Sequence, residues 1–168
     1  SVKEVLGHIV DAERVFSYRA LCIARGEKQS LPSFDENEYV QQANFDKRTL
    51  RNLLDEYDSV RLATVALFKS FSEEILMRKG IANGESITVQ ALLYIIAGHE
   101  IHHRRILDEK YLSKTMMQNV FKNMFNKYRG CSKKVLLSDV IASEAKQSFE
   151  FKLDPKDCIV ASLLAMTI

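Results

Sequence analysis

Three of the four histidines lie within five residues, in the segment His99-Glu-Ile-His-His103 of an apolar helical run. Alternating steps of three and four residues define a seam that contains two of them: Val89, Leu92, Ile96, His99, His103 and Ile106. This spacing keeps side chains on one buried face of an α-helix. Two imidazoles therefore occupy positions where a helical bundle usually has leucine. Because an unpaired polar group is costly to bury, the chain must supply a metal ion or hydrogen-bonding partners for them.

Similar apolar periods predict an all-α fold over residues 1–113. Helices are expected at about residues 2–24, 46–79 and 88–111. Residues 27–46 carry no clear period, which predicts a long connection. The apolar stripe of the second helix is widened by Leu54, Arg61 and Phe68.

Local signals indicate where these helices begin and end. Asp46 is a reasonable N-cap for the second helix, and Ala82-Asn83-Gly84 is typical of a turn. Ser86 or Thr88 is expected to cap the third helix. Residues 1–113 contain no segment that convincingly predicts a strand.

The chain changes character after residue 113. Residues 1–113 carry 15 Lys and Arg against 17 Asp and Glu, a net charge of −2, whereas the remainder carries 9 against 5, or +4. Residues 114–130 are expected to form a basic extension with a short helix. Residues 131–168 resemble the peptide produced when an interspersed bacterial DNA repeat is translated by read-through, so we interpret them as a non-native tail. The alternative is an ordinary C-terminal helix followed by a strand.

The cysteine content and the hydropathy argue against secreted and membrane classes of protein. Three scattered cysteines are too few for a disulfide framework or a thiolate metal site. The longest apolar stretch, residues 159–168, is far too short to span a bilayer. A cytoplasmic protein is expected, with no membrane partner. Nucleic acid is not an expected partner either, because the basic tail lacks aromatic interleaving or a docking motif.

The histidine spacing predicts a metal site. The alternative is that His99 and His103 are hydrogen-bonded core residues and that His8 lies at the surface or near a helix cap. Residues i and i+4 project side by side on a helix, so His99 and His103 can direct ring nitrogens to one ion. His102 is turned about 100° from His103 and is the weaker candidate. His8 lies on a core-facing stripe of the first helix and completes a three-histidine group if the first and third helices pack together. Asp11, three residues after His8, is placed to orient an imidazole by a hydrogen bond.

The same segment also matches His-Glu-x-x-His, the signature of zinc metalloproteases, in which Glu100 would be the general base. No histidine follows His103, so the third ligand that such proteases place downstream is missing. Substrates of these proteases usually align against a strand edge, which residues 1–113 do not predict. Glu100 is more simply interpreted as a solvated helix residue.

Two stretches resemble the DinB-like family of metal-binding four-helix bundles. The first, residues 2–26, includes Gly-His8-Ile-Val-Asp11-Ala-Glu-Arg, and the second runs from Ala82-Asn-Gly84 to Tyr94-Ile-Ile-Ala-Gly-His99-Glu-Ile-His-His103. The resemblance covers residues 1–113. It implies an up-down-down-up helical course, frequent dimers, and a divalent metal held by His8, His99 and His103.

The resemblance also implies two departures from the family pattern. The chain starts where the second helix of the family begins, so we expect that the first helix is missing and that the chain is a fragment. The repeat-like tail is the second departure. A three-helix remnant would leave an apolar flank exposed, which either the basic segment around Val120 to Tyr128 or a second copy of the chain, as a homodimer, could cover.

The expected function is that of a metal-binding bundle whose ion, zinc or nickel, keeps positions open for water or a small ligand. Some relatives are thiol-dependent transferases or isomerases, so the resemblance implies metal-dependent transfer or hydrolysis with a small thiol. Glu100 is the candidate acid or base. The alternative is a non-enzymatic, stress-associated module that the metal only stiffens. The metalloprotease is the least favoured hypothesis.

Overall fold

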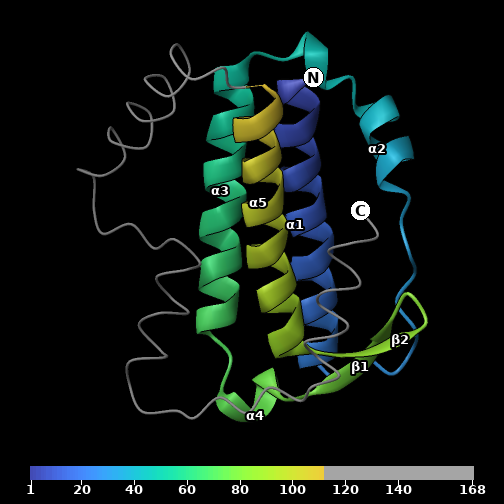
Figure 1. Ribbon diagram of the computed structural model, residues 1–168. Coiled ribbons are helices and arrows are strands. Elements are labelled where there is room, and N and C mark those ends of the chain that lie inside the picture. The colour runs from blue at the N-terminus through green and yellow to red at the C-terminus, as the bar shows by residue number, and fades with distance from the viewer. Residues whose placement is uncertain (112–168) are drawn as a thin grey trace. The chain divides into compact units, whose positions relative to one another are not determined.

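The computed structural model describes residues 1–111, which are mainly helical (Figure 1). The expected extension at 114–130 and the expected tail at 131–168 lie outside the described residues. In chain order the elements are α1 (Val2–Ala24), α2 (Glu36–Ala43), the 3₁₀ turn η1 (Phe45–Lys47), α3 (Leu50–Lys69), α4 (Glu73–Leu76), β1 (Lys79–Ala82), β2 (Glu85–Thr88) and α5 (Val89–Lys110).

Three long helices, α1, α3 and α5, make up most of the described fold. Residues Ser1–Glu100 form one compact unit, and Ile101 begins a second one partway along α5. Within the first unit, α1, α3 and the first turns of α5 run side by side (Figure 1). Ser17 on α1 and Thr64 on α3 share a hydrogen bond of 3.0 Å between their hydroxyl oxygens. No helix among the described residues is long and apolar enough to cross a membrane.

The first and last of these helices have bounds close to those expected from their periods. α1 covers Val2–Ala24, and α5 covers Val89–Lys110. Of the two caps considered for the third expected helix, Thr88 is the one used: its Oγ1 accepts a hydrogen bond of 3.0 Å from the backbone N–H of Ala91. That bond satisfies one of the donors left unpaired in a first helical turn.

The single helix expected over residues 46–79 is wrong at both ends. α3 begins at Leu50, and its cap is Thr49, whose hydroxyl accepts from the N–H of Asn52 at 3.2 Å. Asp46 instead accepts a hydrogen bond of 2.6 Å from the Ser1 hydroxyl. α3 ends at Lys69, after which Ser72 adopts extended backbone angles and caps the short α4. The apolar period continues through the break to Phe71, which is buried, so periodicity alone did not reveal it.

A two-stranded hairpin replaces the strand-free segment that the sequence predicted. β1 and β2 pair in antiparallel register, from Lys79 opposite Thr88 to Ala82 opposite Glu85. The expected turn is present: Asn83 and Gly84 both have positive φ, at 52° and 78°, as in the two-residue turns that favour Asn-Gly. Strands of four residues are too short to produce a clear alternating pattern.

A short helix also interrupts the connection at residues 27–46. Asp35 caps α2, accepting hydrogen bonds from the backbone N–H groups of Asn37 at 2.9 Å and Glu38 at 3.0 Å. α2 has no buried residue. Its Val40 and Ala43 are only partly buried against a core cluster, and two such residues in an eight-residue helix make too short a stripe to give a clear period.

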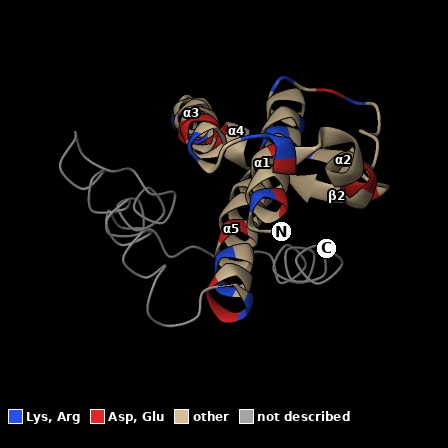
Figure 2. Cartoon of the chain, turned by 90° about the horizontal axis from the view of Figure 1, so that it is seen from above, with Lys and Arg blue, Asp and Glu red and all other residues tan. Residues whose placement is uncertain are grey.

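Charged residues of both signs are interspersed along the described helices (Figure 2). Several form ion pairs near the surface, such as Arg14 of α1 with Glu56 of α3 at 2.6 Å and Arg51 with Asp55, one turn apart on α3, at 2.9 Å. Pairs as exposed as Arg51–Asp55 contribute at most about 1 kcal/mol each. The fold therefore depends mainly on its buried contacts.

One buried contact depends on a glycine in α1. Phe45 belongs to a core cluster with Leu6 and Leu53, and its ring lies directly against Gly7. A Cβ atom added at Gly7 would lie only 2.4 Å from two carbons of that ring. The close approach lets η1 pack onto α1, so we interpret Gly7 as a packing residue.

We expect Gly7→Ala to destabilise the protein. Overpacking a core costs roughly 1–3 kcal/mol, which exceeds the 0.5–1 kcal/mol or so that alanine gains over glycine inside a helix. Urea unfolding of both proteins measures the difference. Gly98→Ala on α5 is the matched control, because a Cβ there meets nothing within 4 Å, and it should be stabilising. A Gly7→Ala protein as stable as Gly98→Ala would contradict this interpretation.

Candidate metal centre

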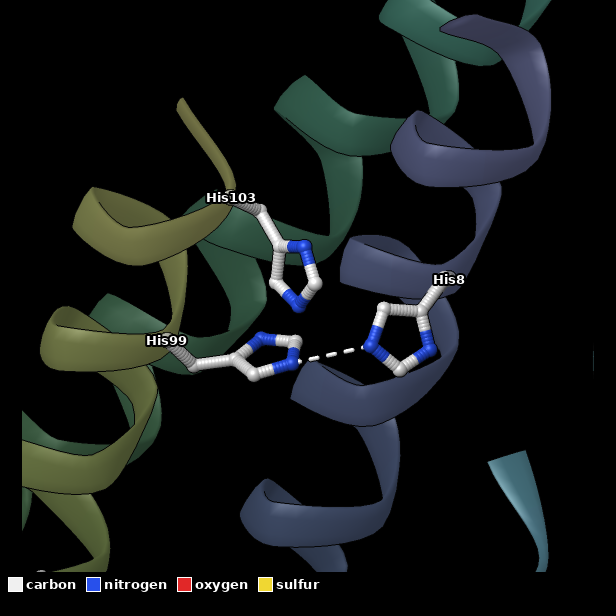
Figure 3. Close-up of side chains that lie close together, drawn as sticks. All are labelled: His8, His99 and His103. Atoms are coloured by element: carbon white, nitrogen blue, oxygen red, sulfur yellow. Dashed lines mark hydrogen bonds between the residues drawn. The ribbon is translucent and has the colours of Figure 1, made fainter. Parts of the chain in front are cut away.

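Three histidine rings converge between α1 and α5 (Figure 3). His8 comes from the second turn of α1, and His99 and His103 come from successive turns of α5. His103 lies beyond the residue at which the second compact unit begins, but one turn of continuous helix connects it to His99. The i,i+4 spacing therefore places both α5 rings on the same face of the helix.

The ring nitrogens lie close enough together to share one ion. One nitrogen from each ring lies within 4.8 Å of those from the other two. The shortest separation joins Nε2 of His8 and Nε2 of His99 at 3.0 Å, and the two rings meet edge to face, with centroids 4.9 Å apart. At this distance the two nitrogens share a hydrogen bond, one as donor and the other as acceptor.

All three rings are buried, with exposed fractions of 8% for His8, 4% for His99 and 8% for His103. Burial lowers the pKa of His8, and the charge of Glu36 opposes this only in part. A lowered pKa favours the neutral imidazole, and the neutral form is the one that binds metal. The environment of His8 therefore favours its metal-binding form.

The aromatic ring of Phe16 packs against one member of the group, His99. Its centroid lies 6.0 Å from that of His99, and the guanidinium of Arg19 lies 5.8 Å from the same Phe16 ring. Arg19 is itself buried and donates a hydrogen bond of 2.7 Å to the carbonyl oxygen of Pro32. This packing connects the segment between α1 and α2 to the helix that carries His8.

The remaining histidine, His102, is not part of the group. It is only partly buried, and its ring packs edge to face on that of His103, with centroids 5.1 Å apart. The sequence also makes His102 the weaker candidate, because its side chain projects about 100° around the helix from that of His103.

Asp11 lies on α1 one turn after His8, half-buried. Its carboxylate accepts a hydrogen bond of 3.4 Å from Arg14. Burial raises the pKa of Asp11, although the charge of Arg14 works in the opposite direction. The role expected for Asp11, orienting an imidazole, stays a prediction.

Glu100, the candidate acid or base, is not a solvated residue. Its carboxylate accepts a hydrogen bond of 2.7 Å from the hydroxyl of Tyr57 and another of 2.5 Å from Nη1 of Arg61. Its side chain is only 17% exposed. Both carboxylate oxygens are thus engaged by α3, an arrangement that favours a role in fixing structure. The acid or base role stays a prediction.

Arg61 also holds a second carboxylate, that of Glu13 on α1. Its Nε lies 3.0 Å from Oε1 of Glu13, and its Nη2 lies 2.7 Å from Oε2, which makes a two-pronged pair. We call Glu13, Tyr57, Arg61 and Glu100 the Arg61 cluster. Burial by itself would lower the pKa of Arg61, but the hydrogen bond and charge of Glu13 outweigh it, so the pKa is raised. The guanidinium is therefore a permanent cation.

Sequence reasoning missed this cluster. Arg61 did fall on the apolar stripe of the second expected helix, where a charged residue is unusual unless it is paired. That position was a signal that the arginine is buried and needs a partner. The partners themselves, Glu13 and Glu100, lie 48 and 39 residues away, and no local pattern connects them.

The three histidines fit a transition-metal ion by their chemistry. Imidazole nitrogen suits zinc, nickel and copper, whereas calcium and magnesium prefer oxygen ligands. Two nitrogens bound to one zinc ion at about 2.0–2.1 Å lie at most about 4.2 Å apart. The 3.0 Å separation of His8 and His99 is compatible with that limit, and the 4.8 Å bound on the group exceeds it only slightly. These three buried histidines could therefore hold a metal ion.

Comparison with known proteins identifies the family. The family model described as DinB superfamily matches residues 1–107, and it covers both histidine-bearing helices up to and including His103. Neither the curated proteins nor the solved structures give a match. The helical fold agrees with the family, whose members are helical bundles that bind divalent metals. On this match, the chain belongs to the DinB superfamily.

Proposed function

We propose that this protein binds one divalent transition-metal ion through His8, His99 and His103. The observation that carries the proposal is the convergence of three buried ring nitrogens within 4.8 Å of one another. Burying three imidazoles in a helical core is costly unless their nitrogens are satisfied. Membership of a family that binds divalent metals supports the same assignment.

Zinc or nickel is the ion that we propose. All three ligands are neutral nitrogens, and a ligand set of this kind leaves the ion with its full double charge and with positions open to other ligands. A bound ion of this kind acidifies a coordinated water or thiol and polarises a carbonyl group.

The chemistry that we propose for the open position is transfer or hydrolysis with a small thiol as a ligand. The contrasting function is a non-enzymatic, stress-associated module in which the metal stiffens the helices. The two differ in one measurable property. A catalytic site admits an added thiol to the metal, whereas a structural site is closed by a fourth protein ligand.

Metal analysis of the purified protein tests the proposal. We expect one equivalent of zinc or nickel per chain, removal by a chelator, and a midpoint of thermal unfolding that rises when the metal is restored, because a ligand that binds only the folded state stabilises it. Co²⁺ substituted at the site should show a visible spectrum that changes when a small thiol is added. A folded protein that takes up no metal would overturn the proposal, and a Co²⁺ spectrum indifferent to thiols would favour the structural module.

A further inference from the structure

A single arginine of α3 connects the two helices that carry the histidines. In the Arg61 cluster, one edge of the guanidinium holds Glu13 of α1 and the other holds Glu100 of α5. The three-histidine group draws its members from α1 and α5 alone. α3 therefore supplies no ligand to this group, but it supplies the cation between the two helices that do.

The cluster lies close to the histidines along both helices. Glu100 directly follows His99, and Glu13 lies five residues after His8. Each carboxylate that Arg61 holds is therefore anchored to the same short stretch of helix as one of the histidines. The exposed fraction is 2% for Glu13 and 7% for Arg61, so neither side chain has water to replace a lost partner.

The guanidinium of Arg61 is well suited to fix the distance between the carboxylates of Glu13 and Glu100. It is planar and rigid, and it donates from several N–H groups in fixed directions, whereas a lysine ammonium is a point charge on a flexible stem. Tyr57 adds to this rigidity: its hydroxyl holds the second oxygen of Glu100, and its ring lies 5.2 Å from the guanidinium carbon of Arg61. Without the cation, the buried carboxylate of Glu13 and the partly buried carboxylate of Glu100 would lose the group that separates their like charges.

We infer that Arg61 is a positioning residue for the metal centre: by holding Glu13 and Glu100 together it sets the separation of α1 and α5 and thereby the 3.0 Å approach of His8 to His99. This inference rests on the proposed function where it concerns metal. The inference also predicts that His8 and His99 lie close together in the metal-free protein, and this part can be tested without a metal.

The decisive variant removes the charges of the cluster without leaving one unpaired. In Glu13→Gln/Arg61→Met/Glu100→Gln the side chains keep similar volumes, and replacing a buried ion network by neutral groups is often tolerated. We expect this triple variant to fold but to bind Co²⁺ at least tenfold more weakly, with an altered visible spectrum. Arg51→Met is the control, since it makes the same substitution on the same helix in an exposed pair, and it should leave both readouts unchanged.

A second variant keeps the test informative if the triple variant does not fold. Arg61→Lys retains the positive charge but cannot hold both carboxylates as a guanidinium does. It should weaken Co²⁺ binding in the same direction, by at least threefold. A folded triple variant, or failing that Arg61→Lys, with the affinity and spectrum of the unaltered protein would overturn the inference.

A metal-free measurement separates this inference from the proposed function. Long-range ¹H–¹⁵N correlation spectra report which ring nitrogen of each histidine carries a proton and whether it is hydrogen-bonded. We expect the signature of the His8–His99 hydrogen bond in the unaltered protein and in Arg51→Met, and its loss in the triple variant and in Arg61→Lys. If the unaltered protein binds no metal, the proposed function fails and these spectra alone decide the inference, which fails if the signature persists in the cluster variants.

Discussion

His99→Ala is expected to abolish stoichiometric metal binding. His99 lies 3.0 Å from His8 between their Nε2 atoms and shares a helix face with His103. Its loss leaves only two histidine ligands, His8 on α1 and His103 on α5. Changing even an outer partner of a metal ligand typically costs 10–100-fold in affinity, and losing one ligand of three should cost more than about 100-fold. Metal content after dialysis, measured per folded chain, tests this.

His102→Ala is the matched control for that experiment. It removes an imidazole from the same helix, three residues further along, at a partly buried position outside the three-histidine group. The control should retain one equivalent of metal. If His99→Ala also retained one equivalent of zinc or nickel, the ligand assignment would be wrong. If both variants lost it, the metal would depend on the helix rather than on the ring of His99.

Arg61→Met is expected to lower the free energy of unfolding by roughly 3–5 kcal/mol, the range measured when one partner of a buried ion pair is removed. Two carboxylates, Glu13 and Glu100, would then remain in the interior without their cation. The loss is a large fraction of the 5–15 kcal/mol or so by which domains are stable. Urea unfolding of the metal-free proteins measures it without any contribution from metal binding.

Two further proteins show whether the loss comes from unpaired charge. The triple variant Glu13→Gln/Arg61→Met/Glu100→Gln should recover most of the stability, since it leaves no buried charge behind. Arg51→Met should stay within about 0.5 kcal/mol of the unaltered protein, as surface substitutions usually do. If Arg61→Met proved as mild as Arg51→Met, the guanidinium would be solvated in solution, and the role assigned to the Arg61 cluster would be lost.

Much of the helical fold followed from local patterns. The periods of α1 and α5 indicated their bounds closely, because each helix buries one continuous apolar stripe that starts or stops at a recognisable residue such as Thr88. The apolar period gave wrong or missing helix bounds where burial did not follow the turn of a helix. The stripe of α3 continued to Phe71 past the end of the helix, and α2 is short and has no fully buried residue. The hairpin β1–β2 was too short for its period to be read, although its Asn83-Gly84 turn was recognised.

The candidate site was likewise predictable only where its residues belong to one helix. The i,i+4 spacing placed His99 and His103 together from the sequence alone, because helix geometry relates residues one turn apart wherever the helix lies. His8 was added on condition that its helix packed against theirs, and the structure meets that condition with a contact across 91 residues. The sequence predicts a solvated Glu100, because no local pattern shows that Tyr57 and Arg61 approach it from α3.

The sequence by itself determined which faces of the helices are apolar and which two imidazoles point the same way, since these properties repeat with the turn of a single helix. Only the tertiary structure decided which helices meet, at what rotation and at what height. It brought His8 to His99 and placed one guanidinium between Glu13 and Glu100. Those contacts depend on how separate helices pack, and the spacing of residues within one helix carries no record of that.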